Sequence, residues 1–285
     1  MKNININAFA DESSPFIDEQ ILALKRNGLN GIEIRDVDKV NISDISFEKA
    51  AEVRKKFDDA GLKIFSLGSP LGKITLGQED FIEHLGKVRH TLELANILGA
   101  ENVRMFSFYI PKGSNPEGHR NEVIDRLCEM SEFFRDLGIY MCHENEKGIY
   151  GDTPERCLDL FNSVNGLCGV FDPANFVQCS VDTLAAWDML KNNIRYMHIK
   201  DALQSGYVVP SGKGVGNIPY ITSEFIKMGG KDFTMEPHLT VFDALKGLER
   251  ADEEIKVGKT MSFASKEEAF DVACKSFREI VEAIV

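Results

Sequence analysis

The stretch 136–172, DLGIYMCHENEKGIYGDTPERCLDLFNSVNGLCGVFD, contains one complete unit of a pattern that recurs along the whole chain. A short apolar run follows Gly138, a helix start at Thr153-Pro154 comes next, and a second apolar run follows Gly166. Proline is favoured in the first turn of a helix and glycine just past its end. The stretch therefore predicts a strand, a helix and a second strand in that order.

The same junction between a helix and an apolar run occurs at seven places: Asn27-Gly28, Ala60-Gly61, Leu98-Gly99, Leu137-Gly138, Asn165-Gly166, Asn192-Asn193 and Gly229-Gly230. At the sixth junction, Asn192-Asn193, we expect asparagine to take the place of glycine just past the helix. An opening strand at 3–9 and a closing helix near 265–284 complete eight strand–helix units. Units of about 30–40 residues predict parallel strands with helical crossovers, and eight of them close a barrel. We expect an α/β fold, a single (β/α)8 TIM barrel over residues 1–285, with an extended loop at 237–264 after the eighth strand.

A doubly wound open sheet is the alternative fold, but no glycine-rich nucleotide fingerprint follows the first strand. The glycine-rich segment Ser211–Gly216 lacks the spacing of a phosphate-binding loop and predicts a flexible barrel loop.

Composition narrows the class of protein. Asp and Glu outnumber Lys and Arg by 45 to 33, and the net charge of −12 argues against nucleic acid or an anionic membrane as a partner. No uncharged stretch is long enough to span a bilayer, and no secretory signal opens the chain. The six cysteines include no CxxC pair, so neither a disulfide framework nor a thiolate zinc site is expected. We expect a cytoplasmic protein with reduced thiols, and a homo-oligomer stays open.

Four consecutive predicted strands end in side chains suited to metal binding. Strands five to eight run into Glu144, Asp172, His198 and Glu236. The chemistry of TIM barrels lies at the carboxyl ends of the strands, so these four side chains should meet at one mouth. Three carboxylates and one imidazole form a hard, oxygen-rich set that suits Mn²⁺, Mg²⁺ or Co²⁺, with Zn²⁺ as a further possibility.

The segments that contain these residues resemble the sugar phosphate isomerase/epimerase family, which belongs to the xylose isomerase-like barrels and has ketose 3-epimerases as relatives. They are Glu144-Asn145, Asp172-Pro173-Ala174-Asn175, His198-Ile199-Lys200-Asp201 and Met235-Glu236-Pro237-His238. The resemblance covers nearly the whole chain, and it implies that the four strand-end residues bind one divalent metal ion. It also implies that the two glutamates move protons.

One departure from that family concerns the sixth strand. The family often has Asp-x-x-His there, whereas in this chain the residue three positions after Asp172 is Asn175. Asparagine can donate a hydrogen bond to a sugar hydroxyl but cannot shuttle a proton, so the identity of the substrate stays open.

The resemblance and the strand ends together predict a divalent-metal-dependent isomerase or epimerase. It would act on a ketose, an aldose or a related polyol-carbonyl substrate through an enediolate, with Glu144 and Glu236 as acid and base. Contacts with the sugar are expected from five residues at or just beyond strand ends: Glu33, Arg35, Asn175, Lys200 and His238.

Three alternatives differ in chemistry. A metal-dependent lyase or dehydratase on a keto-sugar or inosose-like substrate would use the same carboxylates to expel a β-leaving group. A non-catalytic sugar-binding barrel would bind without exchanging protons. DNA repair barrels of the endonuclease IV type need more histidines at early strand ends and fit a net charge of −12 poorly.

Overall fold

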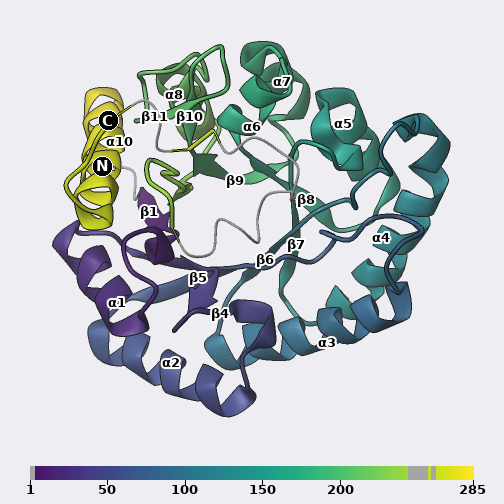
Figure 1. Ribbon diagram of the computed structural model, residues 1–285, viewed down its shortest axis with the longest axis horizontal. Coiled ribbons are helices and arrows are strands. Elements are labelled where there is room, and N and C mark those ends of the chain that lie inside the picture. Colours follow the sequence, from purple (N-terminus) through teal and green to yellow (C-terminus); the bar gives the residue numbers. More distant parts are fainter. Residues whose placement is uncertain (1–3, 243–255, 258–260) are drawn as a thin grey trace.

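The computed structural model describes residues 4–242, 256–257 and 261–285, and these form a closed barrel of eight parallel strands inside a ring of helices (Figure 1). The strand order around the barrel is β1-β12-β9-β8-β7-β6-β5-β2. The prediction of a TIM barrel is confirmed, as are all eight strands: β1 (Asn5–Ala8), β2 (Gly31–Ile34), β5 (Lys63–Gly68), β6 (Asn102–Met105), β7 (Tyr140–Glu144), β8 (Leu167–Phe171), β9 (Ile194–Ile199) and β12 (Asp232–Met235).

The helices pack outside the barrel and connect one strand to the next. They are α1 (Ile17–Arg26), α2 (Phe47–Ala60), α3 (Phe81–Leu98), α4 (Arg120–Phe134), α5 (Pro154–Ser163), α6 (Pro173–Gln178), α7 (Thr183–Leu190), α8 (Ile218–Lys227) and α10 (Lys266–Ile284). Two short hairpins, β3 (Asp36–Val37) with β4 (Val40–Asn41) and β10 (Asp201–Ala202) with β11 (Val208–Val209), lie in the connections.

Local signals fix most of the helix boundaries. The Thr153 side chain accepts a hydrogen bond from the Arg156 N–H and starts α5, as a cap residue before proline should. All six predicted glycine junctions have a positive φ. At the sixth junction the expectation that asparagine replaces glycine is wrong, because neither Asn192 nor Asn193 has a positive φ. Here the Asn193 N–H donates to the Leu190 carbonyl at 2.8 Å, a tight turn that needs no left-handed residue.

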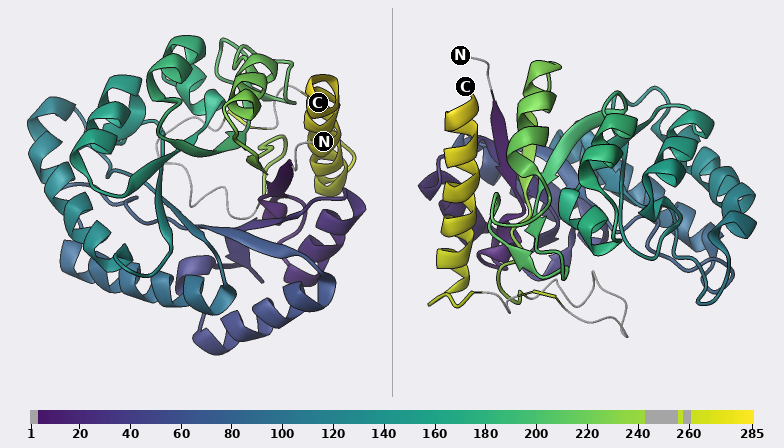
Figure 2. Two further views of the ribbon diagram at one scale, coloured as in Figure 1. Left: turned by 180° about the vertical axis from the view of Figure 1, so that it is seen from behind. Right: turned by 90° about the horizontal axis from the view of Figure 1, so that it is seen from above.

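Pairing of the first and last strands closes the barrel. Asn5 of β1 lies opposite Asp232 of β12 in parallel register. Outside this seam, α10 lies beside α1, and an ion pair of 2.9 Å joins Arg26 to Asp271 (Figure 2). No helix among the described ranges has both the length and the hydropathy that a membrane span requires. Of the predicted loop at 237–264, residues 243–255 and 258–260 lie outside the described part.

Side-chain alternation along the strands separates two buried regions. One is the large apolar core between the barrel and its helices. The other is a layer inside the barrel, formed by Phe65, Cys142, Val170 and Tyr196. Because every second side chain on a strand points to the same face, the strand ends above this layer direct their side chains into the barrel mouth. All six cysteines are free thiols.

Candidate metal centre and active site

The four predicted strand-end residues converge at the barrel mouth. Glu144 ends β7, Asp172 follows β8, His198 lies in β9, and Glu236 follows β12. Each offers one ligand atom, and these atoms all lie within 4.8 Å of one another. All four side chains are buried. We call this set the quartet.

Two buried atoms of the quartet make no regular hydrogen bond among the described residues. They are Asp172 Oδ2, which lies 2.9 Å from Lys200 Nζ, and His198 Nδ1. His198 Nδ1 lies 3.1 Å from Glu144 Oε1 and 3.5 Å from Glu236 Oε2. Converging carboxylates repel one another, so a cation bound among them would stabilise this arrangement. The donor set therefore fits a hard divalent ion.

The helix that follows β8 orients Asp172. Its Oδ1 atom caps α6 by accepting a hydrogen bond of 3.0 Å from the Asn175 N–H, which leaves Oδ2 to face the quartet. The Asn175 side chain in turn donates to Glu144 Oε1 at 3.1 Å and to the Asn145 carbonyl at 2.9 Å. Asn175, predicted to contact substrate, also lines the cavity at this mouth.

Glu33 lies beneath His198, on the side away from the other three quartet members. Its Oε2 atom is 3.1 Å from His198 Nε2, and the Tyr196 hydroxyl donates to its Oε1 at 2.9 Å. A carboxylate can only accept, so Nε2 carries a hydrogen toward Glu33, and Nδ1 is the ring atom left to offer a lone pair to an ion bound at the quartet. Glu33 is fully buried and, among the described residues, is not part of the cavity lining. This position favours holding the imidazole over contacting substrate.

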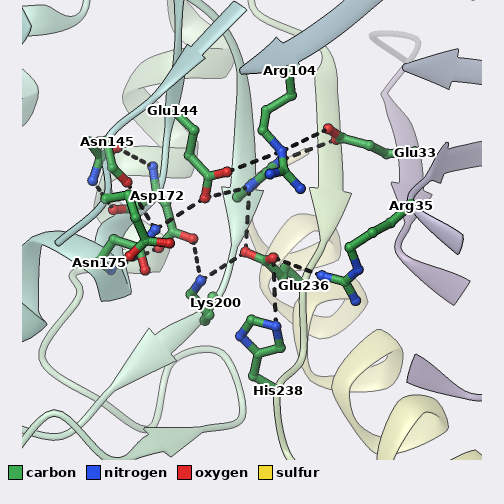
Figure 3. Close-up of polar contacts among 12 residues, drawn as sticks. Glu33, Arg35, Arg104, Glu144, Asn145, Asp172, Asn175, Lys200, Glu236 and His238 are labelled. Carbon is green, nitrogen blue, oxygen red and sulfur yellow. Dashed lines mark hydrogen bonds and ion pairs between the residues drawn. The ribbon is translucent and has the colours of Figure 1, made fainter. Parts of the chain in front are cut away.

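Lys200 lies between two quartet carboxylates (Figure 3). Its Nζ atom is 2.9 Å from Asp172 Oδ2 and 2.8 Å from Glu236 Oε2. Burial by itself disfavours the charged ammonium, but these two carboxylates hold the pKa of Lys200 well above its usual range. Burial raises the pKa of Asp172 to about 7, although the Lys200 charge opposes this shift. Burial acts in the same direction on Glu236, but Lys200, His238 and His198 outweigh it and hold the pKa of Glu236 well below its usual range.

Arg104 of β6 is a residue that the sequence analysis missed. Its Nε atom lies 3.3 Å from Glu144 Oε2 and 4.0 Å from Glu33 Oε1. Its guanidinium packs over the rings of Phe9 and Phe106, at 5.4 and 4.7 Å from their centroids. The sequence did contain a signal for Arg104. It is a single charged residue in the apolar fourth strand, and it lies two positions after a residue that faces the barrel interior.

Arg35 closes the other side of the mouth. Its guanidinium bonds to Asp11 at 2.9 and 3.1 Å and to Glu236 Oε1 at 3.2 Å. Glu12 also faces it at 3.4 Å, and burial raises the pKa of Glu12 to about 8. Glu12 Oε2 accepts the His238 N–H at 2.6 Å. Arg35 thus holds Glu236 from behind the cavity, whose described lining does not include it.

A cavity lined mainly by polar side chains lies next to Glu144 and Glu236 of the quartet. Five predicted residues line it: Glu144, Asn175, Lys200, Glu236 and His238. Side chains that the sequence analysis missed complete its polar wall, among them Lys73, Arg104, Glu146 and Gln178. A wall with these hydrogen-bonding groups matches a small, hydroxyl-rich molecule.

The glycine-rich loop after β11 binds one of the protein's own carboxylates. Asp201 accepts hydrogen bonds of 2.9 to 3.0 Å from the N–H groups of Ala202, Gly212, Gly214 and Gly216. A Cβ at Gly214 would come within 2.3 Å of Asp201 Oδ1, so only glycine fits. These hydrogen bonds hold the loop in place, whereas the sequence predicted a flexible loop. Its N–H groups already bind an anion, the Asp201 carboxylate.

Comparisons with known proteins agree with this architecture. The family model described as xylose isomerase-like TIM barrel matches residues 21–261. No curated protein matches the sequence significantly.

Among solved structures, D-psicose 3-epimerase in the presence of D-fructose is 17% identical, with 99% of each chain covered and a TM-score of 0.76. The probable 3-DHS dehydratase AsbF of petrobactin synthesis from Bacillus anthracis is also 17% identical, with 96% of this chain and 98% of that chain covered and a TM-score of 0.73. The IolI protein with a bound zinc atom is 18% identical, with 99% of each chain covered and a TM-score of 0.73. At these identities the likeness shows the shared fold.

Proposed function

The chain belongs to the xylose isomerase-like TIM barrels, and from that premise we propose that it is a divalent-metal-dependent isomerase or epimerase of a small sugar. The observation that carries the proposal is the quartet. Four ligand atoms from the ends of four strands lie within 4.8 Å of one another, and all four residues are buried. Mn²⁺, Mg²⁺ and Co²⁺ suit its oxygen-rich donors, and zinc, which IolI binds, is also compatible.

Glu144, Asp172, His198 and Glu236 would hold the ion. A bound divalent cation supplies Lewis acidity, which makes a C–H bond next to a sugar carbonyl more acidic. Glu33 keeps the His198 ring in the tautomer that a ligand needs, and Asn175 and Arg104 fix the Glu144 carboxylate in position.

Glu144 and Glu236 are our candidates for the proton transfers. They come from strands separated by β8 and β9, so the two carboxylates reach the quartet from different sides. One would remove the carbon-bound proton to give an enediolate, and the other would return a proton at the opposite face or at the neighbouring carbon. A positioned acid–base group contributes about 10²–10⁴-fold to a rate.

Lys200 and His238 line the same cavity and are candidates for binding the hydroxyl groups of the sugar. The Lys200 ammonium also supports a second function. A charged donor beside Asp172 and Glu236 could protonate a leaving hydroxyl, a step that elimination requires and epimerisation does not. The structural likeness to the dehydratase AsbF adds weight to this alternative of a lyase or dehydratase acting on a keto-sugar.

Incubation with a panel of ketoses in deuterated water and Mn²⁺, read by NMR and mass spectrometry, tests the proposal. The panel should include D-fructose, D-psicose and L-ribulose, each with and without a phosphate group. Isomerisation or epimerisation keeps the formula of the sugar and places deuterium at one carbon. Elimination gives a product that has lost water.

The test variant is Glu144→Gln in the quartet. Its matched control is Glu132→Gln on the exposed surface of α4, where Glu132 pairs with Arg135. Exchange that persists in the first variant, or sugar binding without any exchange in the wild-type protein, would contradict the proposed catalysis. The second outcome would favour a non-catalytic sugar-binding barrel.

A further inference from the structure

Two thiols face each other inside the barrel, on the strands that lead to Glu144 and Asp172. Cys142 of β7 and Cys168 of β8 are direct partners in the parallel register. Their Sγ atoms are 3.4 Å apart. Both pack with the inner layer of Phe65, Val170 and Tyr196. No other pair of thiols among the described residues makes such a contact.

The backbone already has the spacing that a disulfide needs. Neighbouring strands lie about 4.8 Å apart, and disulfides join residues whose Cα atoms are about 4.4–6.8 Å apart. Because Cys142 and Cys168 are register partners on adjacent strands, they fall within this range without movement of either strand. Only the two sulfur atoms have to approach each other.

One of the two thiols can be reached from the amino-terminal end of the barrel. Cys168 is half-buried and lines an open depression, together with Tyr140, Arg195 and the Gly229-Gly230 turn. Cys142 is fully buried behind it. A small oxidant entering the depression therefore meets Cys168 first.

The surroundings of Cys168 favour its reactive form. The Arg195 side chain stacks on Tyr140 at 3.3 Å from the ring centroid and bonds to Asn102. The Cys142 thiol and then this guanidinium hold the pKa of Cys168 below its usual range, although burial opposes them. By contrast, burial raises the pKa of the other five thiols, Cys142 included.

We propose that Cys142 and Cys168 form a reversible oxidation site for small hydroperoxides, separate from the proposed sugar chemistry. The Cys168 thiolate attacks one oxygen of hydrogen peroxide, so that an S–O bond forms, the O–O bond breaks and water leaves. Cys142 then attacks the sulfur of the resulting sulfenic acid, an S–S bond forms, the S–O bond breaks and a second water leaves. Two thiols thus give up two electrons and two hydrogens to one peroxide, and a dithiol reductant reverses the change.

The test treats the full-length protein with hydrogen peroxide at a low molar excess, alkylates the remaining thiols and maps the cysteines by mass spectrometry. We expect a mass loss of two hydrogens, two fewer alkylated thiols and a cross-link between the peptides that contain Cys142 and Cys168. Dithiothreitol should restore both thiols. Cys168 should be lost at least about tenfold faster than Cys128, which is also half-buried but has no thiol beside it.

Three variants sharpen this test. In Cys142→Ser, sulfenic acid at Cys168 should accumulate and be trapped by dimedone, whereas Cys168→Ser should form neither the sulfenic acid nor the cross-link. Cys128→Ser should oxidise as the wild-type protein does. Peptide mapping of the wild-type protein needs no variant to fold, and equal loss of all six thiols or absence of the cross-link there would overturn the proposal.

Discussion

His198 Nε2 lies 3.1 Å from Glu33 Oε2, and this contact turns Nδ1 of the same ring toward Glu144 and Glu236. Glu33 of β2 thus contacts one side of the His198 imidazole, and the proposed ion would bind to the other side. Carboxylates in this position fix the tautomer of a metal-binding histidine and raise its basicity. Glu33 is thus a positioning residue for the quartet.

We predict that Glu33→Gln weakens Mn²⁺ binding by about 10- to 100-fold, because a neutral amide supports the imidazole less well than a carboxylate. Isothermal titration calorimetry with Mn²⁺ measures the affinity, and Glu132→Gln serves as the surface control. An affinity equal to that of the wild-type protein would show that Glu33 does not act through His198.

The two glutamates of the quartet should be required separately for turnover. Glu144→Gln and Glu236→Gln should each lower the rate of deuterium exchange into the substrate by about 10²–10⁴-fold, since each removes one acid–base group. Far-UV circular dichroism should stay unchanged. If either variant keeps most of the exchange rate, that glutamate is not one of the two proton carriers.

Asp201 should matter for stability rather than for chemistry, because its carboxylate accepts four backbone N–H groups. In Asp201→Asn the amide NH₂ would face some of these donors and leave them unpaired. We expect a loss of about 1–3 kcal/mol in the free energy of unfolding, measured by urea denaturation. Asp188→Asn, at an exposed position on α7, is the matched control. An equal, small effect of both substitutions would refute this role.

His84 on α3 should make stability fall at acidic pH. Burial lowers its pKa to about 4, and its Nε2 accepts the Gly72 N–H at 2.9 Å, which requires the neutral ring. The unfolded chain binds the proton more tightly, so the contribution is complete above the ordinary histidine pKa and is lost as the pH falls toward the folded value. Between about pH 7.5 and pH 5 this amounts to about 2 kcal/mol of unfolding free energy.

His84→Gln should therefore flatten the decline in unfolding free energy over that pH range, as followed by urea denaturation at each pH. His119→Gln, near the start of α4, should leave the slope unchanged. A decline that is identical in the wild-type protein and in His84→Gln would exclude His84 as its source.

The barrel and the order of the quartet could be predicted because both depend on local signals. Glycine after each helix and polar residues after apolar runs are visible in the sequence, and the parallel topology brings the strand ends together. The backbone conformation at Asn193 could not be predicted in this way, because a tight turn can end a helix without a left-handed residue.

The remaining parts of the site depend on barrel closure. Arg104 resembles any polar residue in a strand until β6 is placed beside β7, where it meets Glu144. Glu33 and Arg35 were expected at a strand end, but sequence position could not give their depth in the barrel. In the barrel Glu33 lies under His198, and Arg35 lies behind Glu236. Sequence spacing alone therefore predicted the proposed ligands more readily than the residues that hold them.

The most direct test of the central claim is an electron paramagnetic resonance titration of Mn²⁺ with the wild-type protein, His198→Gln and Glu132→Gln. The account predicts one tightly bound ion per chain in the wild-type protein and in Glu132→Gln, and a loss of affinity of at least about 100-fold in His198→Gln. Equal Mn²⁺ binding by all three proteins, or none by the wild-type protein, would contradict a metal centre at the quartet.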